Sequence, residues 1–290
     1  MRLGCIDIGS NTTRLLVADG EGGRLRWVHQ ERSFTRIGHE LLDRGRIGPE
    51  KIGEVVSVVS GQLDSARAYG ACRVRVVATA AARSAANGAE LATAIENATG
   101  LAVEILSAAE EARLAFVGVA GTLEHPPAED LGVVDVGGGS SELVVGAAPN
   151  RVAWWASIPI GSAGVTHAWL GSDPPTTREL VSGRAQIAGE LGRLEVPKPG
   201  AAVAVGGSAT SLSRLAGPLL DAEALGHALA LLGAESSSEI SRRFAIDPER
   251  ARLLPAGLLI LEGVAQAFGT ALRVGQGGIR EGVLLEASKT

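Results

Sequence analysis

The chain is poor in aromatic residues, in cysteine and in basic charge. Aromatic side chains make up 3% of its 290 residues, although 46% of the residues are hydrophobic. This composition predicts tight α/β packing of small side chains. The net charge of −5 argues against a general nucleic-acid-binding protein, which usually carries a basic excess. A polyanionic substrate is still compatible with it, because such a substrate needs only a local basic groove.

The chain also lacks the spacings of a disulfide framework or a zinc site, and it lacks a long apolar run. Cys5 and Cys72 lie in apolar, strand-like runs without a CxxC pattern, so we expect two buried, reduced thiols. The most apolar window, 253–261, contains Pro255 and Gly257 and is too short to cross a bilayer. No signal-peptide pattern opens the sequence. We expect a soluble, cytoplasmic protein without a membrane partner.

One stretch, L-G-V-V-D-V-G-G-G-S-S-E-L-V-V at 131–145, stands out from the rest. A buried strand carries Asp135, a glycine-rich turn follows, and Glu142 opens the next strand. Glycine lets backbone N–H groups approach phosphate oxygens, because it has no Cβ. Two carboxylates beside such a turn predict a metal-assisted phosphate site.

The same stretch has a counterpart earlier in the chain. A shift of 128 residues, without a gap, places 3–18 over 131–146, so that Asp7 coincides with Asp135. Arg14 stands where the second copy has Glu142. The repeat predicts two lobes built by duplication, 1–125 and 126–290, each with its hairpin facing a cleft. The polar segment 122–130, which contains two adjacent prolines, is the predicted boundary.

Strands and helices alternate along the chain, which is typical of α/β proteins. A loop containing Gly38, Gly45 and Gly48 precedes the first expected helix. Expected strands are 2–9, 12–19, 25–34, 74–78, 102–106, the 131–146 hairpin, 151–158, 201–205 and 271–274. Expected helices are 49–69, 88–98, one from the 107–113 segment to Gly121, a short one after 159–166, 176–194, one opened by 206–210, several within 221–270, and a final one after the 275–278 turn.

Two short segments allow more than one interpretation. Ser107 and Glu110 have the spacing of a capping box, whereas Glu111 has no partner at local spacing and is either a site residue or a surface glutamate. The G-G-S-A-T turn at 206–210 ends a buried strand and opens a helix. It is either an anion-binding helix N-terminus or an ordinary strand–helix turn.

Together the motifs resemble the exopolyphosphatase/guanosine pentaphosphatase (Ppx/GppA) family of the actin, Hsp70 and sugar-kinase superfamily. The resemblance implies an α/β fold of two actin-like (ribonuclease H-like) lobes with an active-site cleft between them. The motifs that carry it are I-D-I-G-S-N-T-T-R-L-L-V (6–17), A-T-A-A-A-R-S-A-A-N (78–87), E-E-A-R-L (110–114), V-V-D-V-G-G-G-S-S-E-L (133–143), G-G-S-A-T (206–210) and G-G-I-R-E-G-V-L (277–284).

The resemblance also implies roles for single residues. Glu111 corresponds to the catalytic base for water and Glu142 to its acidic partner, while Asp135 and Asp7 correspond to the ligands of Mg²⁺. Phosphate binding is implied for Ser10, Asn11, Thr12, Arg83, Gly137, Gly138, Gly139, Ser140, Gly206, Gly207 and Ser208.

The leading functional prediction is a Mg²⁺-dependent exopolyphosphatase that removes terminal phosphate from inorganic polyphosphate. Hydrolysis of the 5′ γ-phosphate of guanosine pentaphosphate uses the same chemistry and stays open, as do a kinase of the superfamily and a non-catalytic alarmone-binding regulator. The resemblance favours a homodimer. Basic residues that could line a groove for a long polyanion, or equally lie solvated on the surface, are Arg14, Arg36, Arg113 and Arg280.

Overall fold

The computed structural model describes residues 1–289, which form two compact units. The first unit contains residues 1–124 and the segment that starts at Gly277, and the second unit contains His125–Gln276. The α/β organisation expected from the sequence is confirmed in both units.

The first unit is built on a five-stranded sheet with the order β3-β2-β1-β4-β5. Strands β1, β2 and β3 are antiparallel neighbours, whereas β4 runs parallel to β1 and β5 parallel to β4. The strands are β1 (Arg2–Ile8), β2 (Thr12–Glu21), β3 (Arg24–Phe34), β4 (Arg73–Ala78) and β5 (Val103–Ile105). The helices are α1 (Ile37–Arg44), α2 (Pro49–Ala68), α3 (Ala80–Ser84), α4 (Gly88–Thr99), α5 (Ala108–Ala120) and α12 (Ile279–Ala287).

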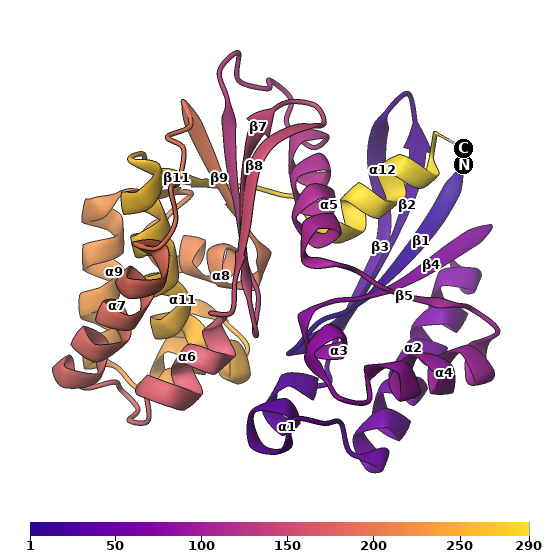
Figure 1. Cartoon of the computed structure of the whole chain (residues 1–290), viewed down its shortest axis with the longest axis horizontal. Helices are drawn as coiled ribbons and strands as arrows, with labels where there is room; N and C mark the ends of the chain where they lie inside the picture. The colour runs from indigo at the N-terminus through magenta and orange to yellow at the C-terminus, as the bar shows by residue number, and fades with distance from the viewer. Residues whose placement is uncertain (290) are drawn as a thin grey trace. The chain divides into compact units, whose positions relative to one another are not determined.

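The alternation of side chains along β1 and β2 builds a core on each face of this sheet (Figure 1). Ile6, Ile8 and Leu15 pack with α2 and α4 on one face. Leu3 and Leu16 pack with α5 and α12 on the other. Because strand residues alternate between faces, Asp7 lies on the face that carries α5 and α12.

The second unit is built on a six-stranded sheet with the order β10-β11-β9-β6-β7-β8. Helix α11 (Pro248–Phe268) packs against this sheet through an apolar core that also includes parts of α7 and α8. The strands are β6 (Leu131–Val136), β7 (Ser141–Ala147), β8 (Arg151–Ile158), β9 (Ala201–Val205), β10 (Leu219–Leu220) and β11 (Leu272–Val274). The other helices are α6 (Ser162–Trp169), α7 (Thr177–Leu191), α8 (Gly206–Ala216), α9 (Ala222–Ala234) and α10 (Ser237–Phe244).

Helix α11 is long and apolar enough to cross a membrane by length and composition, and among the described residues it is the one helix that passes this test. Of its apolar window, 61% is buried inside the structure, as in the core helix of a globular unit. Pro255 lies inside this helix, which continues through it.

The 128-residue repeat is visible in the strand registers. Leu3 opposes Ala18 and Arg73 in the first sheet, and Leu131 opposes Gly146 and Ala201 in the second. Each residue in the second sheet therefore lies 128 positions after its counterpart in the first. The repeat therefore extends beyond the matched hairpin to β4 and β9. A register shift also interrupts the pairing of β2 with β3 after Val17 and the pairing of β7 with β8 after Val145. These two points are equivalent in the repeat.

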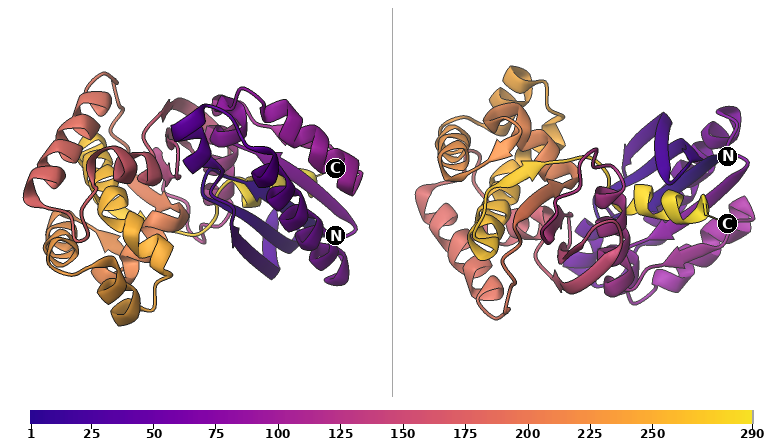
Figure 2. Two further views of the ribbon diagram at one scale, coloured as in Figure 1. Left: turned by 90° about the horizontal axis from the view of Figure 1, so that it is seen from below. Right: turned by 90° about the horizontal axis from the view of Figure 1, so that it is seen from above.

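The C-terminal helix departs from the predicted division of the chain. We predicted a second lobe over 126–290, but α12 packs on α5 and β1 in the first unit, so that the N-terminus and α12 belong to one unit (Figure 2). Glycine makes this packing close: a Cβ on Gly118 of α5 would lie 1.9 Å from the carbonyl oxygen of Gly278, and one on Gly282 would lie 2.1 Å from that of Leu114.

Three further features differ from expectation. Helix α1 occupies the predicted loop before α2, and the short elements α3 and β10 were not expected. Both cysteines are free, as predicted, but only Cys5 is buried, whereas Cys72 is exposed. Burial raises the pKa of the Cys5 thiol, which keeps this group protonated.

Candidate functional site

In the second unit, Asp135 and Glu142 lie directly opposite each other on β6 and β7. Both side chains are buried, with 9% and 3% of their surface exposed. Ser157 on β8 is the next residue in the same row, and its hydroxyl donates a 2.9 Å hydrogen bond to Glu142. The row thus holds two carboxylates on one face of the sheet, beside the glycine-rich turn.

The turn between β6 and β7 is closed by a 3.0 Å hydrogen bond from the Gly137 amide to the Ser140 carbonyl. The Gly138 carbonyl accepts from the Ala163 amide at the start of α6, so that the N-terminus of this helix holds the turn. The amides of Gly138 and Gly139 have no hydrogen-bond partner within residues 1–289. They are therefore available to phosphate oxygens, as the prediction for this turn requires.

The third predicted loop, 206–208, forms the start of α8. Gly206 has φ +85, and a Cβ there would lie 2.4 Å from Asp135 Oδ1, so glycine permits the close approach of this carboxylate. A Cβ on Gly207 would overlap the guanidinium of Arg250, which comes from α11. Ser208 is buried, and its hydroxyl packs beside Gly257.

In the first unit, Asp7 takes the place of Asp135, but the residue opposite it is Arg14. Arg14 donates a 3.1 Å hydrogen bond to Asp7 Oδ2. Asp7 Oδ1 is buried and has no hydrogen-bond partner among the described residues. A buried carboxylate oxygen without a partner is costly, which is consistent with a ligand or ion that satisfies it.

The first hairpin turn repeats the geometry of the second. The Gly9 amide donates to the Thr12 carbonyl at 3.0 Å, and the Ser10 carbonyl accepts from the Gly38 amide at the start of α1. In the part of the chain that the structure describes, the Ser10 and Asn11 amides have no partner. The same backbone groups are therefore available in both turns.

Glu111 and Arg83, both predicted from the sequence, form an ion pair in the first unit. Glu111 lies in the first turn of α5 and is 4% exposed, which excludes the surface-glutamate interpretation. Arg83 Nη1 donates to Glu111 Oε2 at 2.7 Å and to the Leu106 carbonyl at 2.8 Å. The guanidinium thus fixes the position of the Glu111 carboxylate.

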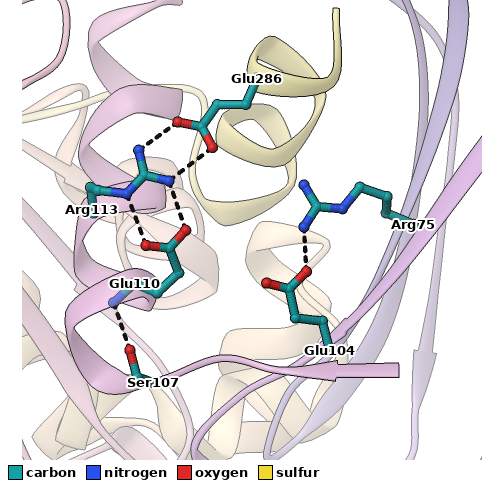
Figure 3. Close-up of polar contacts among 6 residues, drawn as sticks. All are labelled: Arg75, Glu104, Ser107, Glu110, Arg113 and Glu286. Atoms are coloured by element: carbon teal, nitrogen blue, oxygen red, sulfur yellow. Dashed lines mark hydrogen bonds and ion pairs between the residues drawn. The ribbon is translucent and has the colours of Figure 1, made fainter. Parts of the chain in front are cut away.

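The neighbouring Glu110 has a different environment (Figure 3). Its amide donates to Ser107 Oγ, as the capping-box prediction requires, but its carboxylate binds Arg113 instead of the N-cap amide. Arg113 also binds Glu286, and this link joins α5 to α12. The two carboxylates raise the pKa of Arg113, and its guanidinium lowers the pKa of Glu110 and Glu286. Glu110 and Arg113 are therefore structural.

The carboxylates of the second unit fit a magnesium site in which the protein supplies some of the ligands and the substrate supplies the others. Among the side chains that the structure describes, no group of three or more His, Cys, Asp or Glu residues could hold a metal by itself. Mg²⁺ is commonly bound by one or two carboxylates together with substrate phosphates and water. The opposed Asp135 and Glu142 of the second unit supply such a donor set.

Sequence reasoning missed two arginines that lie beside the predicted loops. Arg250 contacts the start of α8. It lies in the first turn of α11, and an arginine in the first turn of a helix is too common to indicate a site from the sequence. Arg32 lies on β3 directly opposite Arg14, and the prediction of a strand over 25–34 did not specify this register.

Comparison with known proteins agrees with these observations. The model of the Ppx/GppA phosphatase family matches residues 16–290. The chain belongs to this family. Exopolyphosphatase 2 of Mycobacterium tuberculosis is 32% identical to it over 98% of this chain and 96% of the relative. Exopolyphosphatase 1 of Mycobacterium leprae is 30% identical over 98% of this chain and 89% of the relative.

Solved structures of the Ppx/GppA family share the fold. The Aquifex aeolicus family member is 30% identical, with a TM-score of 0.84 over 99% of this chain and 97% of the other. A Cytophaga hutchinsonii exopolyphosphatase has a TM-score of 0.89 at 22% identity, over 100% and 98% of the two chains, which shows the fold alone. The predicted family and its actin-like α/β fold are thus confirmed, and the Ppx/GppA membership makes the chain a phosphoanhydride hydrolase.

Proposed function

We propose that this protein is a Mg²⁺-dependent exopolyphosphatase that releases the terminal phosphate of inorganic polyphosphate. The observation that carries the proposal is the buried pair Asp135 and Glu142, opposed across β6 and β7 beside a turn with available amides. The relatives named exopolyphosphatase, at 30% and 32% identity, support polyphosphate as the substrate.

The reaction needs an attacking water, a proton acceptor and neutralisation of charge on the transferred phosphoryl group. We assign proton acceptance to Glu111, whose carboxylate Arg83 holds in place. Water then adds to the terminal phosphorus, the bond to the bridging oxygen breaks, and the shortened chain leaves. Glu142 is proposed as the second acidic group, and the amides of the two hairpin turns bind phosphate oxygens.

Asp135 would hold Mg²⁺, and Asp7 is a second candidate ligand. The ion would neutralise charge on the phosphate oxygens. The remaining residues assigned to phosphate binding are Ser10, Asn11, Thr12, Arg83, Gly137, Gly138, Gly139, Ser140, Gly206, Gly207 and Ser208. The cleft shared by both hairpins, the cytoplasmic location and the homodimer stay predictions.

The test is phosphate release with Mg²⁺ from three substrates side by side: long polyphosphate, tripolyphosphate and guanosine pentaphosphate. We expect the largest kcat/KM for long polyphosphate. Phosphate release from guanosine pentaphosphate alone would instead assign the protein to alarmone hydrolysis. Saturable alarmone binding without phosphate release from any of the three would contradict an enzymatic function.

A further inference from the structure

Each of the two hairpin turns leads into a pair of adjacent hydroxyl residues, Thr12 and Thr13 in the first unit and Ser140 and Ser141 in the second. The two pairs coincide under the 128-residue shift of the repeat. Among the residues that the structure describes, the Thr12 and Ser140 hydroxyls have no hydrogen-bond partner, whereas the Thr13 and Ser141 hydroxyls bind within the protein. The first hydroxyl of each pair is therefore available to a ligand, and the second is not.

In the second unit, the Ser141 hydroxyl connects the hairpin to the segment that leads into α6. Ser141 is fully buried, and its hydroxyl donates a 2.7 Å hydrogen bond to the Ile160 carbonyl. Ile160 lies immediately before Gly161, the N-cap residue of α6. From the start of this helix, the Ala163 amide donates to the Gly138 carbonyl in the turn. Ser141 thus fixes the segment from which α6 holds the turn.

The first unit contains the same connection, built from different side chains. Thr13 is also fully buried, and its hydroxyl lies 3.0 Å from the hydroxyl of Thr35. Thr35 lies immediately before Arg36, the N-cap residue of α1. At the start of α1, the Gly38 amide donates to the Ser10 carbonyl at 2.7 Å. Both units therefore tie the strand after the turn to the residue before the helix that holds the turn.

The position of this helix start matters because the turns offer backbone amides to phosphate. A backbone amide has no side-chain torsion with which to adjust to a ligand, so its direction must be set by the surrounding structure. Loss of a buried hydroxyl leaves its partner without a hydrogen bond, and the local backbone shifts to relieve that cost. A shift of the helix start would move the carbonyls that it holds and, with them, the neighbouring amides.

We propose that Ser141 and Thr13 are positioning residues that hold the two turns in the conformation that binds phosphate. Neither hydroxyl contacts the substrate, and each acts through the backbone of its turn. The proposal rests on the proposed function, because it takes phosphate as the ligand of both turns. It divides each hydroxyl pair between two tasks: Thr12 and Ser140 face the ligand, and the residues that follow them hold the turn.

The test in the second unit compares Ser141→Ala with Ser241→Ala. Ser241 lies on α10, outside both turns, and its hydroxyl also donates a 2.7 Å hydrogen bond to an isoleucine carbonyl, that of Ile246. Ser141→Ala should raise KM for long polyphosphate about five- to tenfold and change kcat less, as expected for one weakened hydrogen bond to bound substrate. Ser241→Ala should keep the original KM. Equal KM values for the two variants would overturn the role of Ser141.

The test in the first unit compares two substitutions at Thr13. Thr13→Val removes the hydroxyl, whereas Thr13→Ser keeps it. The Thr13 carbonyl accepts a 3.1 Å hydrogen bond from Gln62 Nε2 on α2, and neither substitution removes this bond. Thr13→Val should raise KM about five- to tenfold, and Thr13→Ser should stay within about twofold of the original value. Equal KM values for the two variants would overturn the role of Thr13.

A binding measurement separates failure of the positioning role from failure of the proposed function. Equilibrium binding of tripolyphosphate in the Glu111→Gln background does not depend on turnover, and Ser141→Ala should weaken it about five- to tenfold. Equal affinities with and without Ser141→Ala would overturn the positioning role even if the protein is an exopolyphosphatase. If guanosine pentaphosphate alone is hydrolysed, the proposed substrate fails, but Ser141→Ala should still raise KM for that substrate.

Discussion

Asp135 and Glu142 are register partners on β6 and β7, and both carboxylates are buried. At the equivalent positions of the first unit, Asp7 and Arg14 form an ion pair. The duplication has thus kept the backbone and changed one charge. The second unit thus places two carboxylates opposite each other where the first unit places a carboxylate opposite a cation. This difference supports the proposal that Asp135 holds Mg²⁺.

Replacement of Asp135 by asparagine tests this assignment. Asn keeps the shape of the side chain and removes the charge that attracts Mg²⁺, so half-maximal phosphate release should require at least about tenfold more Mg²⁺. The measurement is a Mg²⁺ titration of phosphate release for both proteins. An unchanged titration would remove Asp135 from the metal site.

The close packing of α5 on α12 predicts a stability effect that is independent of the site. A Cβ at Gly118 would lie 1.9 Å from a backbone carbonyl oxygen, so Gly118→Ala should lower the free energy of unfolding by about 2 kcal/mol or more. Gly53 in α2 is a matched control, because a Cβ there meets nothing within 4 Å. Gly53→Ala should stabilise by about 0.5–1 kcal/mol. Equal melting temperatures for the two variants would contradict the packing.

The capping box at the start of α7 predicts a pH-dependent contribution to stability. Hydrogen bonds to the Glu179 carboxylate, first from the Thr176 amide and then from the Ser172 amide, lower the pKa of Glu179 from 4.5 to about 2. Because the folded-state pKa is depressed, this contribution is complete above the unfolded value and is lost as the pH falls from about 4.5 to about 2.

The corresponding variant is Glu179→Gln. The difference in urea midpoint between the original protein and this variant should be largest at neutral pH and should shrink between pH 4.5 and pH 2. A difference that stays constant over this interval would show that the charge of Glu179 does not stabilise the helix.

Much of the fold could be predicted because its signals are local. Strand β8 was expected over the residues it occupies, 151–158, since a short β-rich run identifies it. Helix α1 was missed because its N-cap residue, Arg36, does not cap the helix through its side chain and adopts φ 49, so no capping pattern marks the start of the helix. Helix α12 was assigned to the wrong unit because its contact with Gly118 joins residues far apart in the chain.

The same distinction applies to the candidate site. The Asp135 and Glu142 pair could be predicted because one hairpin carries both residues. The partner of Glu111 could not be derived from local spacing, because Arg83 lies 28 positions away. The sequence motif pointed to both residues, and the structure adds that they bind each other.

The most direct test of the whole account is phosphate release from long polyphosphate by Glu111→Gln, with Glu110→Gln as the matched control. The account predicts that Glu111→Gln remains folded and binds polyphosphate but loses about 10²–10⁴ in kcat, the usual share of a general base. Glu110→Gln should stay within about threefold of the original rate, since Glu110 binds Arg113. A loss of less than tenfold for Glu111→Gln, or equal losses for both variants, would contradict the assignment of Glu111 as the catalytic base.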